Sequence, residues 1–298
     1  MNDPLVSVVI PTYKRHNKLN RAIGSILNQS FNGFEIIIVN DFPEESIENH
    51  IKYNSSKIRT INHEVNKGAP GARNSGIKSS RGKYIALLDD DDAWKPDKLE
   101  IQVRKFEKLD EKYGMVYTGR EVIKGSEVVK RYIPKKSGWI YEKLLTGNFI
   151  PSETPLIEKK CFERVGMFDT KLQGCQDWDM WLRISKKYKI AKVSKILAEC
   201  YKGHNDRIEE NHAGMFKGRK RVFEKNKDDF EKNKDALSNY YMKQGLDIAY
   251  SKTLGSFNYL LRSLVYYRNI KAIPILTTLA LPYNTRRKIL DKLREVKN

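Results

Sequence analysis

Short apolar runs alternate with amphipathic segments along the first part of the chain. Val6–Ile10 is a β-rich run ended by Pro11, and Glu35–Val39 is a continuous apolar run. Between them, Asn17–Gln29 carries its apolar residues at helical spacing along one face. Continuous apolar runs are typical of strands that are covered on both faces. A strand–helix–strand unit of this length predicts a parallel pair joined by a right-handed crossover.

The same alternation continues to residue 117. The expected elements are a helix over Glu44–Tyr53, strands over Lys57–Ile61, Tyr84–Leu88 and Met115–Tyr117, and helices that start near Ala69 and at Pro96. Strands that alternate with helices in this way predict an α/β fold with a mainly parallel sheet and flanking helices.

The remaining pattern divides near residue 210. Up to that point we expect a hairpin over Glu121–Tyr132, a strand over Pro151–Ile157, short helices over Trp139–Leu145 and Cys161–Val165, a helix over Asp177–Lys187 and a strand over Ala191–Tyr201. From Asn211 the chain reads as charged or amphipathic helices, at Phe216–Asn233, Tyr240–Tyr250, Phe257–Tyr267 and Arg286–Lys297. We therefore predict an α/β domain over residues 1–210 and a basic helical region over residues 211–298.

Charge changes this picture, because the net charge of the 298 residues is +19. Residues 202–298 hold 21 Lys and Arg against 11 Asp and Glu. Nucleic acid, an anionic membrane surface and phosphate-bearing substrates are the candidate partners of such a chain. The apolar stretch Ala272–Leu281 is too short to span a bilayer, so it predicts either a core helix or an interfacial helix.

The ends and the cysteines suggest a reducing compartment. The N-terminal stretch lacks a basic region before its short apolar run, so we expect a first strand rather than a signal peptide. Cys161, Cys175 and Cys200 are widely spaced, which predicts neither a disulfide framework nor a zinc site. We expect a cytoplasmic protein.

The strongest chemical signal is a run of four carboxylates, Asp89 to Asp92, directly after the predicted strand Tyr84–Leu88. Like charges this close raise one another's pKa and destabilise the fold unless they are compensated. A divalent cation such as Mn²⁺ or Mg²⁺ accepts hard oxygen ligands and would compensate them. Ligands in open α/β sheets also bind at the carboxyl ends of strands. An acidic loop paired with lysines and arginines is the alternative.

Four motifs then coincide in order: Asn40-Asp41 after a strand, NKGAPGARNSG from Asn66, LLDDDDAW from Leu87, and QDWDMWLR from Gln176. With these motifs, Leu5–His204 resembles a family 2 glycosyltransferase of the GT-A fold. The resemblance implies a metal-dependent enzyme that moves a hexosyl or N-acetylhexosaminyl group from a nucleotide diphosphate sugar, with inversion, to a glycan or lipid-linked acceptor. The usual Asp-Asp-Gly-Ser is here Asn40-Asp41-Phe42-Pro43, which is a departure from the family pattern.

The resemblance also assigns the donor site. Asp41 falls on the carboxylate that contacts uracil, although a turn-forming role at a strand end would suit it as well. Asp91 falls on the metal ligand of the Asp-x-Asp motif, and Asp89 or Asp90 on the group that holds the ribose or completes the site. The remaining predicted nucleotide-sugar residues are Pro11, Thr12 and Tyr13 after the first strand, Gly68 in the glycine-rich loop, and Arg73, whose guanidinium suits phosphate contact.

Two further residues complete the predicted site. Asp177 falls on the general base, which inversion requires near the acceptor hydroxyl. The family usually has Glu-Asp where this chain has Gln176-Asp177, and Asp177 would also suit a helix N-cap. His204, after the last strand, falls on a histidine near the metal or diphosphate, with a surface position as the alternative. By spacing, Trp139, Trp178 and Trp181 are expected in the core.

Two other classes of function are weaker. A nucleotidyltransferase would carry a glycine-rich phosphate loop after the first strand, where this chain has Pro11-Thr12-Tyr13. A nucleic-acid-binding protein would interleave aromatic residues with its basic patch, and that pattern is not evident, so no nucleic-acid partner is expected. The predicted partners are a nucleotide-sugar donor, a glycan or lipid-linked acceptor, and peripheral contact with the anionic cytoplasmic face of a membrane.

Overall fold

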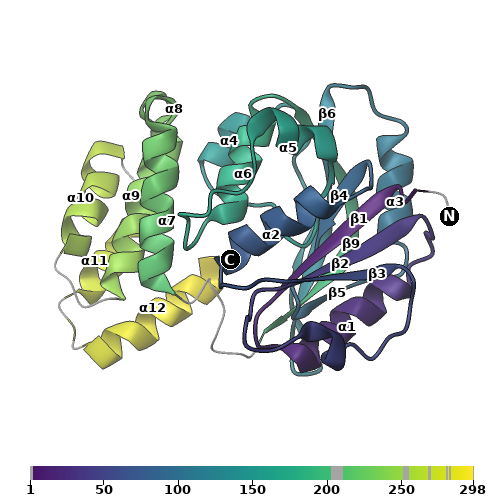
Figure 1. Ribbon diagram of the computed structural model, residues 1–298. Helices are drawn as coiled ribbons and strands as arrows, with labels where there is room; N and C mark the ends of the chain where they lie inside the picture. The colour runs from purple at the N-terminus through teal and green to yellow at the C-terminus, as the bar shows by residue number, and fades with distance from the viewer. Residues whose placement is uncertain are drawn as a thin grey trace. The chain divides into compact units, whose positions relative to one another are not determined.

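The computed structural model describes residues 3–202, 211–250, 255–267, 270–279, 281 and 283–297 (Figure 1). Its chain divides into two compact units. The first unit comprises Met1–Tyr141, Phe149–Thr170 and Asp179–His204. The second unit comprises Glu142–Asn148, Lys171–Trp178 and Asn205–Asn298. Two short segments from the middle of the sequence, one of them the start of α6 (Gln176–Ser185), thus belong with the C-terminal helices.

The first unit is built on a nine-stranded sheet with the order β3-β2-β1-β4-β8-β6-β9-β5, and β7 pairs with β6. The strands are β1 (Val6–Thr12), β2 (Phe34–Asn40), β3 (Ile58–Asn62), β4 (Tyr84–Leu87), β5 (Asp92–Trp94), β6 (Tyr113–Lys124), β7 (Glu127–Tyr132), β8 (Leu156–Glu158) and β9 (Lys189–Lys202). β1 to β4 pair in parallel, whereas β5, β7 and β8 are antiparallel to their neighbours. The predicted α/β class is confirmed, with a sheet that is parallel in its N-terminal half and mixed beyond it.

Helices cover both faces of the parallel half of the sheet (Figure 1). One face packs against α1 (His16–Leu27) and α3 (Lys98–Phe106), where Val8 lies in one buried cluster with Ile23 and Val103. The opposite face packs against α2 (Gly68–Ser79), because a Cβ on Gly76 would lie 2.3 Å from Val9 Cγ1. The alternation of Val8 and Val9 between the two faces explains why these strands read as continuous apolar runs.

Three expected elements differ from the structure. The helix expected over Glu44–Tyr53 is only the 3-10 turn η1 (Ile47–His50), because Ile47 alone in this turn is buried. The strand expected over Met115–Tyr117 extends to the full length of β6, since its second half pairs with β7 and β9. The acidic run, expected to follow a strand, itself continues into strand β5, which begins at Asp92 and pairs antiparallel with β9. The predicted hairpin over Glu121–Tyr132 is confirmed.

Short helices occupy the middle of the sequence. They are α4 (Tyr141–Leu145), α5 (Lys159–Val165) and α6 (Gln176–Ser185). Phe168 contacts the rings of Phe162 and Trp181 with centroids 6.2 and 6.5 Å apart, and these three side chains are buried. Trp139 is 61% exposed, so its expected place in the core is wrong.

The second unit is helical. It contains α7 (His212–Lys225), α8 (Lys227–Lys232), α9 (Lys234–Ala249), α10 (Gly255–Tyr267), η3 (Ile270–Ala272), α11 (Ile273–Thr278) and α12 (Tyr283–Lys297). Its core includes Met242, Leu260, Ile275 and Leu290, one from each of four helices. Among the described residues, no helix combines the length and the apolar character needed to cross a membrane.

Candidate active site

The parallel register brings three strand ends to one edge of the sheet. Thr12 of β1 pairs with Asn40 of β2, and Val9 of β1 pairs with Leu87 of β4. The residues that follow these strands therefore lie near one another, and they include Asp41 and the acidic run from Asp89. Ligands of parallel α/β sheets bind at this edge.

Asp90 and Asp91 of the acidic run are buried and compensated by specific donors. Thr12 Oγ1 donates to Asp90 Oδ2 at 2.8 Å. Arg15 Nη1 lies 3.4 Å from Asp90 Oδ1 and 3.3 Å from Asp91 Oδ2, so one guanidinium nitrogen bridges two carboxylates. Asp90 and Asp91 are only 5% and 3% exposed. Arg15 is thus the counter-ion of Asp90 and Asp91. The spacing of residues in the sequence did not predict this role of Arg15.

Asp89 has its own partners. Arg73 Nη2 donates to its Oδ1 at 2.7 Å, and Ser152 Oγ donates to its Oδ2 at 3.1 Å. Arg73 comes from the buried side of α2, which begins at Gly68 with a positive φ of 71°. The structure therefore brings together the predicted residues Thr12, Arg73, Asp89, Asp90 and Asp91.

Compensation of Asp90 is incomplete. Burial raises the pKa of its carboxyl to about 6, and the neighbouring Asp91 and Asp89 add to the rise. The hydrogen bond from Thr12 and the charge of Arg15 act in the opposite direction. A buried carboxyl with a raised pKa and hard oxygen ligands beside it suits a further positive charge, such as a divalent cation. The donor set of Asp89, Asp90 and Asp91 therefore fits Mn²⁺ or Mg²⁺.

Asp41 lies in a second polar group at the same edge. Its Oδ1 is 2.7 Å from His63 Nδ1 and accepts a hydrogen bond from the Lys67 backbone N–H at 2.8 Å. His63 Nε2 is in turn 2.8 Å from Ser75 Oγ. Sequence analysis missed His63, although it directly follows β3 and its N–H bonds to Asn40 O at 2.9 Å. The strand-end rule that selected Asp41 would also have selected His63.

Aromatic rings lie beside Asp41. Tyr13 and Phe42 meet edge to face with centroids 5.6 Å apart, and Lys14 Nζ lies 4.3 Å from the centroid of Phe42. Tyr13 is 42% exposed, whereas Pro11 is buried within β1. Phe42, where the family pattern has glycine, thus forms a ring contact with a predicted nucleotide-sugar residue.

Asp177 belongs to the second unit. Its Oδ2 accepts a hydrogen bond from Asn148 Nδ2 at 2.7 Å, and its Oδ1 accepts one from the Trp178 N–H at 2.8 Å. Because α6 begins at Gln176, Asp177 lies inside the first turn and is not the N-cap residue. The expected Trp178 and Trp181 are both buried. His204 lies outside the described residues.

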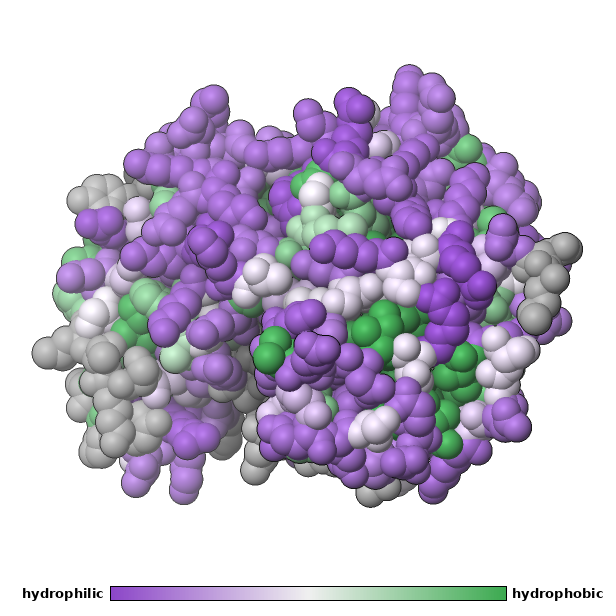
Figure 2. Space-filling view, viewed as in Figure 1, coloured by the Kyte–Doolittle hydropathy of each residue, from purple (hydrophilic) through white to green (hydrophobic). Residues whose placement is uncertain are grey.

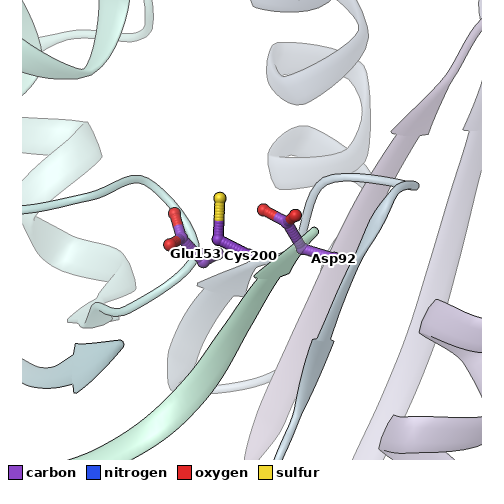
Figure 3. A group of neighbouring side chains, drawn as sticks. All are labelled: Asp92, Glu153 and Cys200. Carbon is purple, nitrogen blue, oxygen red and sulfur yellow. The ribbon is translucent and has the colours of Figure 1, made fainter. Parts of the chain in front are cut away.

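A second group of ligand-type side chains includes Asp92, the last carboxylate of the acidic run (Figure 3). Oxygen and sulfur atoms of Asp92, Glu153 and Cys200 lie within 4.8 Å of one another, and all three residues are buried. Arg120 Nη1 contacts Glu153 Oε1 at 3.0 Å, and the Tyr201 N–H donates to Asp92 Oδ1 at 3.1 Å. Basic and amide groups therefore already compensate these carboxylates.

Lys98 adds a second cation near Glu153. Its Nζ donates to Gln102 Oε1 at 2.7 Å and lies 3.9 Å from the centroid of the Trp94 ring. Complete burial lowers the pKa of this ammonium to about 7, although the charge of Glu153 acts to raise it. Lys98 is thus a buried amine whose charge is costly in the folded protein.

Comparison with known proteins identifies the class. Residues 7–162 match the model of the glycosyl transferase family 2, which is more than half of the chain. The protein therefore belongs to this family. A relative from Rickettsia felis, named an uncharacterized glycosyltransferase, is 38% identical over 191 residues, which make up 61% of this chain and 31% of the relative. Across the five rickettsial relatives the chain spans between 28% and 61% of their length.

A relative with a named activity comes from Escherichia coli. WfgD, named as a UDP-Glc:alpha-D-GlcNAc-diphosphoundecaprenol beta-1,3-glucosyltransferase, is 28% identical over 227 residues, which make up 75% of this chain and 86% of WfgD.

Solved structures share the fold. Residues 1–349 of Staphylococcus aureus TarS in complex with UDP-GlcNAc give a TM-score of 0.65 at 14% identity, covering 98% of this chain and 92% of that one. The mannosyltransferase PcManGT from Pyrobaculum calidifontis, in complex with GDP-Man and Mn²⁺, gives 0.63 at 15% identity, covering 100% and 87%. The predicted GT-A fold with C-terminal helices is confirmed.

The pKa of Lys98 leads to a prediction on stability. Between pH 7 and pH 9 the folded protein loses the Lys98 proton while the unfolded chain keeps it. Stability therefore rises with pH in this window, because the unfolded state binds more protons. Replacing Lys98 by methionine removes this contribution. We expect the free energy of unfolding of the unmodified protein to rise by about 2 kcal/mol relative to Lys98→Met between pH 7 and pH 9.

Urea unfolding at both pH values measures the difference. Lys108→Met serves as the control, because Lys108 is exposed and should show no such change. Parallel pH dependence of the unmodified protein and Lys98→Met would contradict the assignment of a buried, deprotonating amine.

Proposed function

We propose that this protein transfers a sugar from a nucleotide diphosphate sugar, with UDP as the nucleotide, to a hydroxyl group of a glycan or lipid-linked acceptor, with inversion. The observation that carries the proposal is the group of Thr12, Arg73 and the carboxylates of Asp89 to Asp91 at the carboxyl edge of a parallel sheet. Family 2 membership supports the reaction class. The UDP-GlcNAc and GDP-Man complexes of the structural neighbours support a nucleotide-sugar donor.

In this proposal Asp91, with Asp89 or Asp90, holds Mn²⁺ or Mg²⁺, and His204 is a further candidate ligand. When bound, the cation would neutralise the charge of the departing diphosphate. The Mn²⁺ of PcManGT supports a divalent ion. In the same proposal Arg73, which contacts Asp89, also donates to phosphate oxygens, since a planar guanidinium presents five donors.

Asp177 is the proposed general base. An inverting transfer requires one carboxylate that accepts the proton of the acceptor hydroxyl. Asn148 holds Asp177 through its side-chain amide, which fixes one carboxylate oxygen and keeps the ionised form hydrogen-bonded. Asn148 is therefore a positioning residue for the base.

The C-terminal helices supply a surface for an anionic membrane on the cytoplasmic side. Phe257, Leu261 and Val265 follow one another at intervals of four residues on α10 and are 49%, 37% and 60% exposed. Residues 255–291 contain one acidic residue, Asp291, and six basic ones: Arg262, Arg268, Lys271, Arg286, Arg287 and Lys288. An exposed apolar stripe within a basic segment is typical of interfacial helices. Hydrophilic side chains cover most of the face seen in Figure 2.

The diphosphoundecaprenol in the name of WfgD supports a lipid-linked acceptor.

The metal ligand generates the first prediction of function. Asp91→Asn keeps the size of the side chain but removes a negative ligand, so we expect Mn²⁺-dependent binding of UDP to fall at least tenfold. Isothermal titration calorimetry with and without Mn²⁺ measures this effect. Asp228→Asn, an identical change at an exposed position of α8, is the control and should bind as the unmodified protein does. Equal Mn²⁺-dependent binding by Asp91→Asn would exclude Asp91 as a ligand.

The base generates the second prediction. Asp177→Asn should bind UDP normally but lower sugar transfer by a factor of roughly 10² to 10⁴, because the amide does not accept the proton. The measurement is UDP release in the presence of acceptor, beside the binding constant of the same sample. Transfer at the normal rate by Asp177→Asn would show that another group is the base.

The apolar stripe generates the third prediction. Vesicles containing phosphatidylglycerol should carry the protein upward in a flotation gradient, whereas vesicles of phosphatidylcholine alone should carry much less of it. The double variant Phe257→Glu/Val265→Glu should stay at the bottom of the gradient. Asn258→Glu/Thr285→Glu, which adds the same charge at exposed polar positions of α10 and α12, should still float. Equal flotation of the two double variants would show that charge alone, without the stripe, governs binding.

A further inference from the structure

A row of three polar side chains, Asp41, His63 and Ser75, begins at the proposed donor site, and Asp41 and His63 in it are buried. Asp41 Oδ1 lies 2.7 Å from His63 Nδ1, and His63 Nε2 lies 2.8 Å from Ser75 Oγ. Asp41 and His63 are 3% and 5% exposed. Each residue comes from a different part of the fold: Asp41 follows β2, His63 follows β3, and Ser75 lies on α2.

We infer that His63, held by Ser75, is a positioning residue that fixes the carboxylate of Asp41 to select nucleotides whose base offers a ring N–H donor. The inference rests on the proposed function, because it assumes that a nucleoside diphosphate binds at this edge. The inference adds two points to the proposed function. It names His63 as a residue that determines base specificity, and it names the chemical class of base that is accepted.

The proton positions follow from the chemistry of the three groups. An ionised carboxylate only accepts hydrogen bonds, so His63 Nδ1 must carry the proton that it shares with Asp41. In the neutral ring Nε2 then accepts from the Ser75 hydroxyl, which can rotate to donate. Asp41 therefore selects the tautomer of the ring, and Ser75 fixes the orientation of the ring through Nε2.

The two hydrogen bonds of Asp41 fall on one oxygen. His63 Nδ1 and the Lys67 N–H both contact Oδ1. Within the part of the chain that the structure describes, these are the hydrogen bonds of the Asp41 carboxylate, and its Oδ2 accepts none. Two donors on Oδ1 fix the plane of the carboxylate, so Oδ2 is presented in a defined direction as an acceptor for a ligand.

An acceptor in a fixed direction discriminates between bases. Uracil presents N3–H and guanine presents N1–H, each a donor that a carboxylate oxygen can accept. Cytosine has an unprotonated N3 in the corresponding place, so its lone pair would face the lone pairs of Asp41. A buried polar group left without its partner weakens binding, whereas a satisfied one strengthens it. A rotating carboxylate would discriminate less, because it could turn away from the wrong base.

The same three residue types also occur in hydrolytic triads, so covalent catalysis by Ser75 is the alternative role of this row. A nucleophilic serine needs free donors beside it to stabilise an oxyanion. Ser75 lies inside α2 (Gly68–Ser79), well beyond its first turn, where backbone N–H groups are used in helical hydrogen bonds. The geometry therefore favours positioning of Asp41 over covalent catalysis by Ser75.

The test compares UDP with CDP, which differ in the base alone. Calorimetric titration with Mn²⁺ present gives the ratio of the two dissociation constants for the full-length protein and its variants. We expect the unmodified protein to prefer UDP. His63→Leu should weaken UDP binding by about tenfold and leave CDP binding unchanged, so the preference should fall by the same factor.

Two milder variants separate positioning from folding. His63→Asn places an amide N–H near the position of Nδ1 and should restore most of the preference for UDP. Ser75→Ala removes only the hydroxyl and should lower the preference by a smaller factor than His63→Leu. If His63→Leu fails to fold, these two variants still give the ratio, because each keeps a donor toward Asp41.

The outcomes distinguish this inference from the proposed function. A protein that binds neither UDP nor GDP would overturn the proposed function itself. A protein that binds UDP and CDP equally, or one whose preference is unchanged in His63→Leu, would overturn the role of His63 alone. If His63→Leu does not fold, an unchanged preference in Ser75→Ala would overturn it. A preference lost in His63→Leu and regained in His63→Asn would support it.

Discussion

The structure depends on how negative charge is held at the carboxyl edge of a parallel sheet. Pairing of β1 with β2 and β4 brings the ends of three strands together, and two of these strands are followed by carboxylates. The repulsion is not diluted by the overall charge of +19, because Coulomb energy within a few ångströms depends on the nearest groups. The nearest groups are Arg15, Arg73 and Thr12. Arg15 directly precedes α1, Arg73 lies on α2 and Thr12 ends β1, so the fold sets their positions.

The compensation differs from one carboxylate to the next. Asp89 faces a guanidinium and a hydroxyl, Asp41 faces an imidazole and a backbone N–H, and Asp90 shares one nitrogen of Arg15 with Asp91. Burial, together with the charges of Asp91 and Asp89, raises the pKa of Asp90, so the folded protein carries a cost at neutral pH that an additional cation would relieve. Asp92, one residue further, turns into β5 and pairs with a different group. Four consecutive aspartates thus divide into three at the proposed donor site and one, Asp92, that begins β5.

Sequence reading succeeded where the physical cause was local. The runs Val6–Ile10, Glu35–Val39 and Tyr84–Leu88 were found as strands because burial on both faces requires continuous apolar residues. The helix expected over Glu44–Tyr53 failed because Asn62 Oδ1 accepts from the Ile47 N–H, a contact between distant segments that helical spacing does not encode. Arg15 was missed for the same reason, since its partners are set by the turn after β1. His63 differs, because its place directly after β3 is a local signal of the kind that selected Asp41. The assignments of Asp41, Arg73 and Asp89 to Asp91 needed the motif order, because single carboxylates at strand ends are common turn formers.

Unfavourable backbone conformations occur beside proposed site residues in each of the two units. Among the described residues, Lys14 and Cys175 are the non-glycine residues with positive φ, at 58° and 59°. Lys14 directly follows Thr12 and Tyr13, and Cys175 precedes Asp177 by two residues. Such conformations cost about 1 kcal/mol or more each and persist where surrounding structure holds them, often at functional sites. Gly147, with φ of 151°, directly precedes Asn148, the partner of Asp177. The chain therefore accepts unfavourable backbone angles beside the donor-site residues and beside the proposed base, and regular secondary structure elsewhere offsets their cost.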